Sequence, residues 1–130
     1  MGNEIAKKLL LHKAKQALIM NEPDGYLDTL LGHFPENVCL VKESSDPVDF
    51  VHLFVKDISE LNQFLGSALK VLKKDGLFWI SYPKKSSKVK SDLNRDILVS
   101  ILRRDGYEGV SLISIDETWS AMRVKPVREN

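Results

Sequence analysis

The sequence has only one cysteine, Cys39, among its 130 residues, so it cannot form an internal disulfide and it suits a reducing compartment. It also has almost no net charge, because 19 lysines and arginines nearly balance 18 aspartates and glutamates. A formal charge of +1 gives no overall attraction to nucleic acid or to an anionic membrane, so any preference for anions would have to be local. Cys39 stands between apolar residues with no histidine or basic residue beside it, which favours a small buried side chain over a nucleophile.

Long hydrophobic runs are missing as well. The apolar stretches are far shorter than a membrane span, and Leu9-Leu10-Leu11 is too short for the core of a signal peptide. Met1-Gly2 begins a myristoylation pattern that Ala6 does not complete. We therefore predict a soluble, cytoplasmic protein that forms one domain over residues 1–130 and binds neither membranes nor nucleic acid.

The common catalytic and metal-binding motifs are also absent. The sequence contains no Gly-x-Ser-x-Gly, no phosphate-binding Walker loop and no His-Glu-x-x-His. His12 and His33 have no cysteine or carboxylate at ligand spacing, so we predict no metal site. Trp79 and Trp119 lie in apolar, β-prone runs and are expected in the core rather than in a stacking pocket.

A repeated helix-ending pattern is the clearest positive feature. Lys-Lys-Asp-Gly at residues 73–76 and Arg-Arg-Asp-Gly at residues 103–106 each follow a helical pattern of apolar residues, and each precede a β-prone segment. Basic residues in a last turn complement the helix dipole, and a glycine just beyond it supplies a left-handed end. The pattern predicts helices that lead directly into strands, and therefore an alternating α/β fold.

Hydrophobic periodicity places the other elements. Residues 49–55 form a nearly unbroken apolar run, as expected for a strand covered on both faces in a parallel sheet. Asp57 and Glu60 have the spacing of a capping box, and apolar residues then recur at helical spacing. The last two strands are expected to be antiparallel because their connection is short. Strands are predicted over residues 16–20, 37–43, 49–55, 77–82, 110–115 and 119–124, and helices over 3–11, 26–31, 58–72 and 93–102.

Residues 49–124 resemble the second half of a class I S-adenosylmethionine-dependent methyltransferase, most closely at residues 72–80 (LKKDGLFWI). More closely, nearly the whole chain resembles a small bacterial family catalogued only as a domain of unknown function, through residues 79–85 (WISYPKK), 92–96 (DLNRD) and 116–121 (DETWSA). This resemblance implies a three-layer α/β/α sandwich with a reduced methyltransferase-like Rossmann topology. Its mostly parallel six-stranded sheet would have the order 2-1-3-4-6-5 and a C-terminal antiparallel hairpin. The resemblance implies no known activity.

The candidate ligand site is the edge where the parallel strands end, because open α/β sheets bind ligands beyond those ends near the topological switch point. An acid after the second strand holds ribose hydroxyls in dinucleotide- and methyl-donor-binding folds, although a glutamate at a strand edge is also common without that role. The predicted cofactor-binding residues are Asn21, Glu22 and Glu43, and the predicted pocket edge is formed by Lys56, Asp57 and Tyr82.

The loop after the first strand departs from the methyltransferase pattern. Those enzymes use a Gly-rich loop so that the backbone can approach the cofactor closely. Here residues 20–26 are MNEPDGY, in which Gly25 is the only glycine and Pro23 lacks a backbone donor. The loop disfavours S-adenosylmethionine, the one cofactor that the resemblance suggests, and the sequence identifies no other.

A lysine-rich loop precedes the last predicted helix. Ammonium groups beside a helix N-terminus can hold a phosphate or a carboxylate. The alternative is a solvated loop with a serine cap, and the lack of arginine or stacking aromatics in the loop argues against a nucleic-acid groove. The predicted anion-binding residues are Lys84, Lys85, Ser86, Ser87 and Lys88.

For function, the leading prediction is a non-catalytic, degenerate methyltransferase-like domain that binds a small anionic ligand or a protein partner. The alternative is a divergent methyltransferase that holds S-adenosylmethionine with Glu22, Glu43 and the edge of the third strand. A third hypothesis is a homodimer formed through an exposed sheet edge or apolar patch. No catalytic residue is identified.

Overall fold

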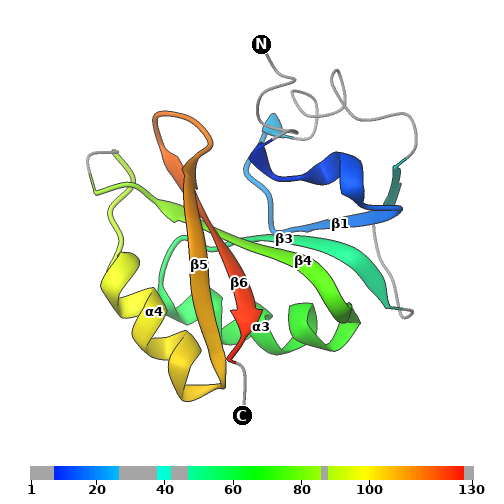
Figure 1. Ribbon diagram of the computed structural model, residues 1–130. Helices are drawn as coiled ribbons and strands as arrows, with labels where there is room; N and C mark the ends of the chain where they lie inside the picture. The colour runs from blue at the N-terminus through cyan, green and yellow to red at the C-terminus, as the bar shows by residue number, and fades with distance from the viewer. Residues whose placement is uncertain (1–7, 27–37, 42–46, 86–87, 128–130) are drawn as a thin grey trace.

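The computed structural model describes residues 8–26, 38–41, 47–85 and 88–127, which form a mixed six-stranded sheet in the order β2-β1-β3-β4-β6-β5 (Figure 1). β1 pairs in parallel with β2 and β3, β3 pairs in parallel with β4, and β6 is antiparallel to both β4 and β5. The predicted strand order and C-terminal hairpin are confirmed. The strands are β1 (Gln16–Met20), β2 (Cys39–Val41), β3 (Val48–Phe54), β4 (Leu72–Pro83), β5 (Tyr107–Ser114) and β6 (Trp119–Pro126).

Two α-helices, α3 (Ile58–Val71) and α4 (Arg95–Arg104), pack on the same face of the sheet (Figure 1). Each begins at a side-chain cap, because Asp57 and Asn94 accept a backbone N–H of the first turn at 2.9 Å. In α3 the predicted capping box is altered, since Glu60 accepts the N–H of Lys56 rather than that of the cap residue.

The two predicted helix-ending patterns have different structures. Gly106 has a φ of 85° and donates its N–H to the Arg103 carbonyl at 3.1 Å, so the left-handed end of α4 is confirmed. The prediction for residues 73–76 is wrong, because α3 ends at Val71 and those residues belong to β4. A Cβ added to Gly76 would lie 3.3 Å from the Asp49 carbonyl oxygen and closer still to the residues before it, so this glycine permits a close approach between strands.

The hydrophobic core lies on both faces of the sheet. The face under α3 and α4 buries apolar side chains of β3 and β4 against Leu61, Leu65 and Leu98. The other face buries both tryptophans, as predicted, and the Trp79 indole N–H donates to the Leu9 carbonyl at 3.0 Å. β3 is buried at every position except Asp49, which confirms the prediction that both of its faces are covered.

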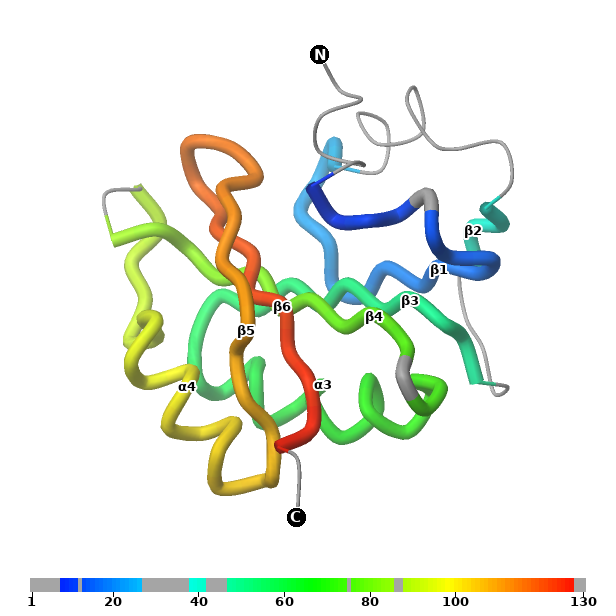
Figure 2. The backbone as a smooth tube through the Cα atoms, in the orientation of Figure 1, coloured from blue at the N-terminus to red at the C-terminus, as the bar shows by residue number. Residues whose placement is uncertain are grey.

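Residues 8–15 cover the face opposite the α-helices (Figure 2). They contain the 3₁₀-helix η1 (Leu11–Lys13). Most of the helices predicted over residues 3–11 and 26–31 lies outside the described residues, so the second helical layer stays a prediction. The prediction of a buried Cys39 is wrong: its side chain is exposed, because β2 is the edge strand of the described sheet and pairs there only with β1. Within the described ranges, no helix has the length and apolar character needed to cross a membrane.

Candidate functional site

The strand order places a topological switch point between β1 and β3. β2 lies on one side of β1 and β3 on the other, so the chain reverses direction across the sheet here. Ligands of open α/β sheets bind beyond the carboxyl ends of strands at such a point. Asn21 and Glu22 follow β1, while Lys56 and Asp57 follow β3.

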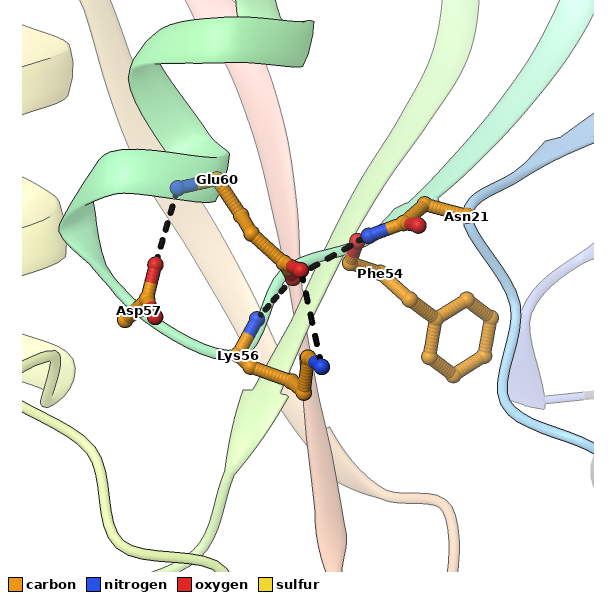
Figure 3. A network of polar contacts seen from close by, with 5 residues as sticks. All are labelled: Asn21, Phe54, Lys56, Asp57 and Glu60. Atoms are coloured by element: carbon orange, nitrogen blue, oxygen red, sulfur yellow. Dashed lines mark hydrogen bonds and ion pairs between the residues drawn. The ribbon is translucent and has the colours of Figure 1, made fainter.

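A polar network joins these two strand ends (Figure 3). The Asn21 side-chain amide donates to the Phe54 carbonyl at 2.9 Å and to Oε1 of Glu60 at 3.1 Å. The same Oε1 accepts the Lys56 N–H at 2.8 Å, and the Lys56 ammonium lies 3.7 Å from Oε2. Asn21 has a φ of 57°, a left-handed conformation that asparagine tolerates better than most residues. We call Asn21, Lys56 and Glu60 the β1–β3 corner.

The structure gives the other predicted residues of this edge different roles. The Asp57 carboxylate caps α3, and the next backbone N–H, that of Ile58, donates to Asp92 at 2.9 Å. Glu22 is half-buried beside Asn21. Glu43 lies outside the described residues. Glu60 was not predicted as a site residue, although its capping spacing was visible in the sequence.

Two cavities lie farther along the edge, where β4 ends and α4 begins. The first has a volume of about 480 Å³ and the second of about 450 Å³, and the two share Pro83, Lys84, Lys85 and Asn94. We call this region the β4–α4 corner. The first cavity is also lined by Tyr82, Arg95, Asp96 and Ser120, and the second by Val89, Lys90, Ser91 and Leu93.

Lys84 and Lys85 of the predicted anion site line both cavities. Lys90, which was not among the predicted residues, lines the second cavity. Lys84 is fixed in place, because its ammonium donates to the Ser114 hydroxyl at 2.6 Å and its N–H to the Thr118 carbonyl at 2.7 Å. Lys88 is exposed and lines neither cavity, and Ser86 and Ser87 lie outside the described residues.

Tyr82 was predicted at the pocket edge and lines the first cavity, although the residue is largely buried. Burial raises the pKa of its hydroxyl, while the positive charge of Arg95 lowers it and the negative charge of Asp96 raises it.

A buried polar cluster, which sequence reasoning missed, connects the strands behind the edge. Nε2 of His52 on β3 lies 2.6 Å from the Ser81 hydroxyl on β4, and its Nδ1 lies 3.4 Å from the Tyr26 hydroxyl. His52 and Ser81 are both fully buried, so they hold strands together and offer no surface to a ligand. Burial lowers the pKa of His52 to about 3, and the imidazole is neutral. Burial, followed by the negative charge of Asp116, raises the pKa of Tyr26 well above its ordinary value.

The residues in the described ranges contain no group of histidine, cysteine or acidic side chains that could hold a metal ion. The sequence signal for the buried cluster was one histidine in an apolar run; its partner Ser81 is 29 positions away and became visible only with the strand register.

No family model matches the chain, and no curated protein matches it in sequence. The resemblance to a bacterial family of unknown function therefore stays a prediction. The chain is similar in fold to solved structures of methyltransferases. An O-methyltransferase family protein from Burkholderia thailandensis superposes with a TM-score of 0.66 at 12% identity, over 100% of this chain and 56% of that one.

Two further matches are structures with the methyl donor or its product. DhpI, in a complex with S-adenosylhomocysteine, has a TM-score of 0.61 at 12% identity, over 97% of this chain and 84% of that one. The O-methyltransferase TomG from Streptomyces achromogenes, in complex with S-adenosylmethionine, has a TM-score of 0.60 at 11% identity, over 98% of this chain and 79% of that one. At such identities the comparisons show the fold alone, and that fold is a methyltransferase-like α/β fold.

Proposed function

We propose that this chain is a divergent methyltransferase that uses S-adenosylmethionine at the carboxyl ends of β1, β3 and β4. The leading prediction from sequence, a non-catalytic domain, has no support in the comparisons, which favour its alternative. The observation that carries the proposal is the polar β1–β3 corner, because it stands at the switch point where open α/β folds bind their ligands.

The side chains of this corner, together with Glu22 beside it in the chain, suit the groups of the cofactor. The carboxylates of Glu22 and Glu60 are acceptors for ribose hydroxyls or for the ammonium of the methionine moiety, and the ammonium of Lys56 suits the carboxylate of that moiety. Side chains would replace the backbone donors of the usual Gly-rich loop. Pro23 has no N–H, and the Tyr26 N–H is already donated to the Pro23 carbonyl at 3.1 Å. When bound, S-adenosylmethionine supplies a methyl group on a positively charged sulfur.

Binding at this corner requires little rearrangement. The ion pair between Lys56 and Glu60 has a 3.7 Å separation, and the Lys56 side chain is 61% exposed. The Glu60 side chain is 22% exposed, but water around the lysine still screens the attraction, so the ammonium can turn from Glu60 to a ligand at a cost of about 1 kcal/mol. The amide contact of Asn21 to the Phe54 carbonyl would keep the strand ends in place meanwhile.

Isothermal titration calorimetry with S-adenosylhomocysteine and S-adenosylmethionine tests the proposal. We expect saturable micromolar binding, which Glu22→Gln weakens about tenfold through the loss of a charge-assisted hydrogen bond worth about 1.5 kcal/mol. Glu43→Ala should also weaken it, as the sequence predicts for the end of the second strand. Glu108→Gln, at the start of β5 and away from this edge of the sheet, is the matched control for the loss of one negative charge. Absence of binding at millimolar ligand would refute the proposal.

A further inference from the structure

The β4–α4 corner is separate from the polar network and from the buried histidine cluster. We propose that it binds the anionic group, a phosphate or a carboxylate, of a small organic molecule. If the proposed function holds, this molecule is the methyl acceptor. The anion site itself does not depend on the proposed function.

Positive charge is concentrated at the β4–α4 corner. The walls of the two cavities carry four cationic side chains, Lys84, Lys85, Lys90 and Arg95, and one acidic side chain, Asp96. Their balance is three positive charges, while the whole chain has a formal net charge of +1. The lining of these cavities is therefore more positive than the chain as a whole, which favours an anion locally.

In the part of the chain that the structure describes, these charges lack strong internal partners. Among the described residues, neither Lys85 nor Lys90 has an acidic partner within ion-pair distance. Arg95 and Asp96 lie 3.7 Å apart with side chains 66% and 90% exposed, so water screens their attraction. The contact of Lys84 is to a neutral hydroxyl, which orients the ammonium without neutralising it.

The shape and the lining of the two cavities also suit a small organic anion. Lys84 and Lys85 line both cavities. An anionic group beside these two lysines could therefore belong to a ligand that occupies either cavity. Tyr82 and Pro83 on one side, and Val89 and Leu93 on the other, offer apolar surface to the remainder of the ligand. Volumes of 480 and 450 Å³ suit a small organic molecule with a polar end.

The two corners are neighbours along one edge. The N–H of Val55, just before Lys56, donates to the Ser81 carbonyl, just before Tyr82, at 2.9 Å. Ends of adjacent strands are about 4.8 Å apart. A ligand at the β4–α4 corner would therefore lie beside a cofactor at the β1–β3 corner, which is the arrangement that transfer between two bound molecules needs.

The test measures thermal unfolding with inorganic phosphate and, separately, with succinate, at constant ionic strength. At ten times the dissociation constant we expect one of these anions to raise the Tm of the wild type by about 5 °C. The double variant Lys85→Gln/Lys90→Gln should lose most of this shift. The control Lys73→Gln/Lys74→Gln removes the same charge from two exposed lysines at the start of β4 and should keep it.

The outcomes separate the two proposals. If neither anion stabilises the wild type, or if both double variants lose the shift equally, the anion site is refuted. If the shift is lost only in the Lys85/Lys90 variant while S-adenosylhomocysteine does not bind, the anion site stands and the methyltransferase proposal fails. A larger shift with phosphate than with succinate identifies the ligand group as a phosphate, and the reverse identifies it as a carboxylate.

Discussion

The two corners of the sheet edge use their polar groups in opposite ways. At the β1–β3 corner, Asn21, Lys56 and Glu60 contact one another and a strand carbonyl. At the β4–α4 corner, Lys85 and Lys90 line open space, with no acidic partner in the part of the chain that the structure describes. The first corner is held in position before a ligand arrives, whereas the second keeps its charge available. One edge of the sheet thus has a pre-ordered polar site next to a positively charged site that attracts anions.

His52→Ala should disturb both corners, because His52 lies on β3 and hydrogen-bonds to Ser81 on β4. The substitution removes a fully buried ring, leaves a cavity and leaves the Ser81 hydroxyl buried without its partner. We expect a loss of about 3–5 kcal/mol in the free energy of unfolding. Urea denaturation measures this loss, and a cost below about 1 kcal/mol would show that the buried cluster does not support the edge.

Acid should weaken the same support without any substitution. The pKa of His52 is about 3 in the folded protein, against an ordinary value of 6.5, so below pH 6.5 the unfolded chain binds a proton that the folded chain does not. The contribution of neutral His52 to the free energy of unfolding is therefore fully present above pH 6.5. It falls by about 1.4 kcal/mol per pH unit between pH 6.5 and pH 3.

Urea denaturation at pH 7, 6 and 5 measures this slope, before most carboxylates titrate. His52→Gln keeps a hydrogen-bonding side chain that cannot take up a proton, so its stability should change much less over this range. Parallel slopes for the two proteins would contradict the assignment to His52.

Substitution of Asn21 should alter the β1–β3 corner and leave the β4–α4 corner unchanged. Asn21→Gly keeps the left-handed backbone and removes the two amide contacts, for a cost of about 1 kcal/mol. Asn21→Ala removes the same contacts and adds backbone strain of about 1 kcal/mol. Both variants should keep the phosphate or succinate response of the other corner. Equal stability of the two variants in urea would show that the φ of 57° carries no strain.

Local sequence patterns predicted a helix end correctly where contacts within the helix determine it. The Arg-Arg-Asp-Gly pattern ends α4 at a left-handed Gly106, as expected. The similar Lys-Lys-Asp-Gly pattern became part of β4, because the pairing of Leu72 with Val48 draws these residues into the sheet. The two paired residues are 24 positions apart in the sequence, so the four-residue pattern could not predict the pairing.

The same limit applies to the candidate site. Asn21, Lys56 and Tyr82 were predicted because strand ends are visible in the sequence and meet at one edge. Glu60 and Arg95 were missed as site residues, because only the packing of α3 and α4 shows which groups of the first helical turns face that edge. The contact of His52 with Ser81 needed the register between β3 and β4.

Backbone amide chemical shifts in nuclear magnetic resonance titrations test most directly whether the edge holds two distinct sites. With S-adenosylhomocysteine, we expect the largest changes in chemical shift at Asn21, Glu22 and Lys56. With the preferred anion, phosphate or succinate, we expect the largest changes at Lys85, Lys90 and Asn94. Changes at the same corner for both ligands, or at neither corner for S-adenosylhomocysteine, would refute the proposal of two distinct sites.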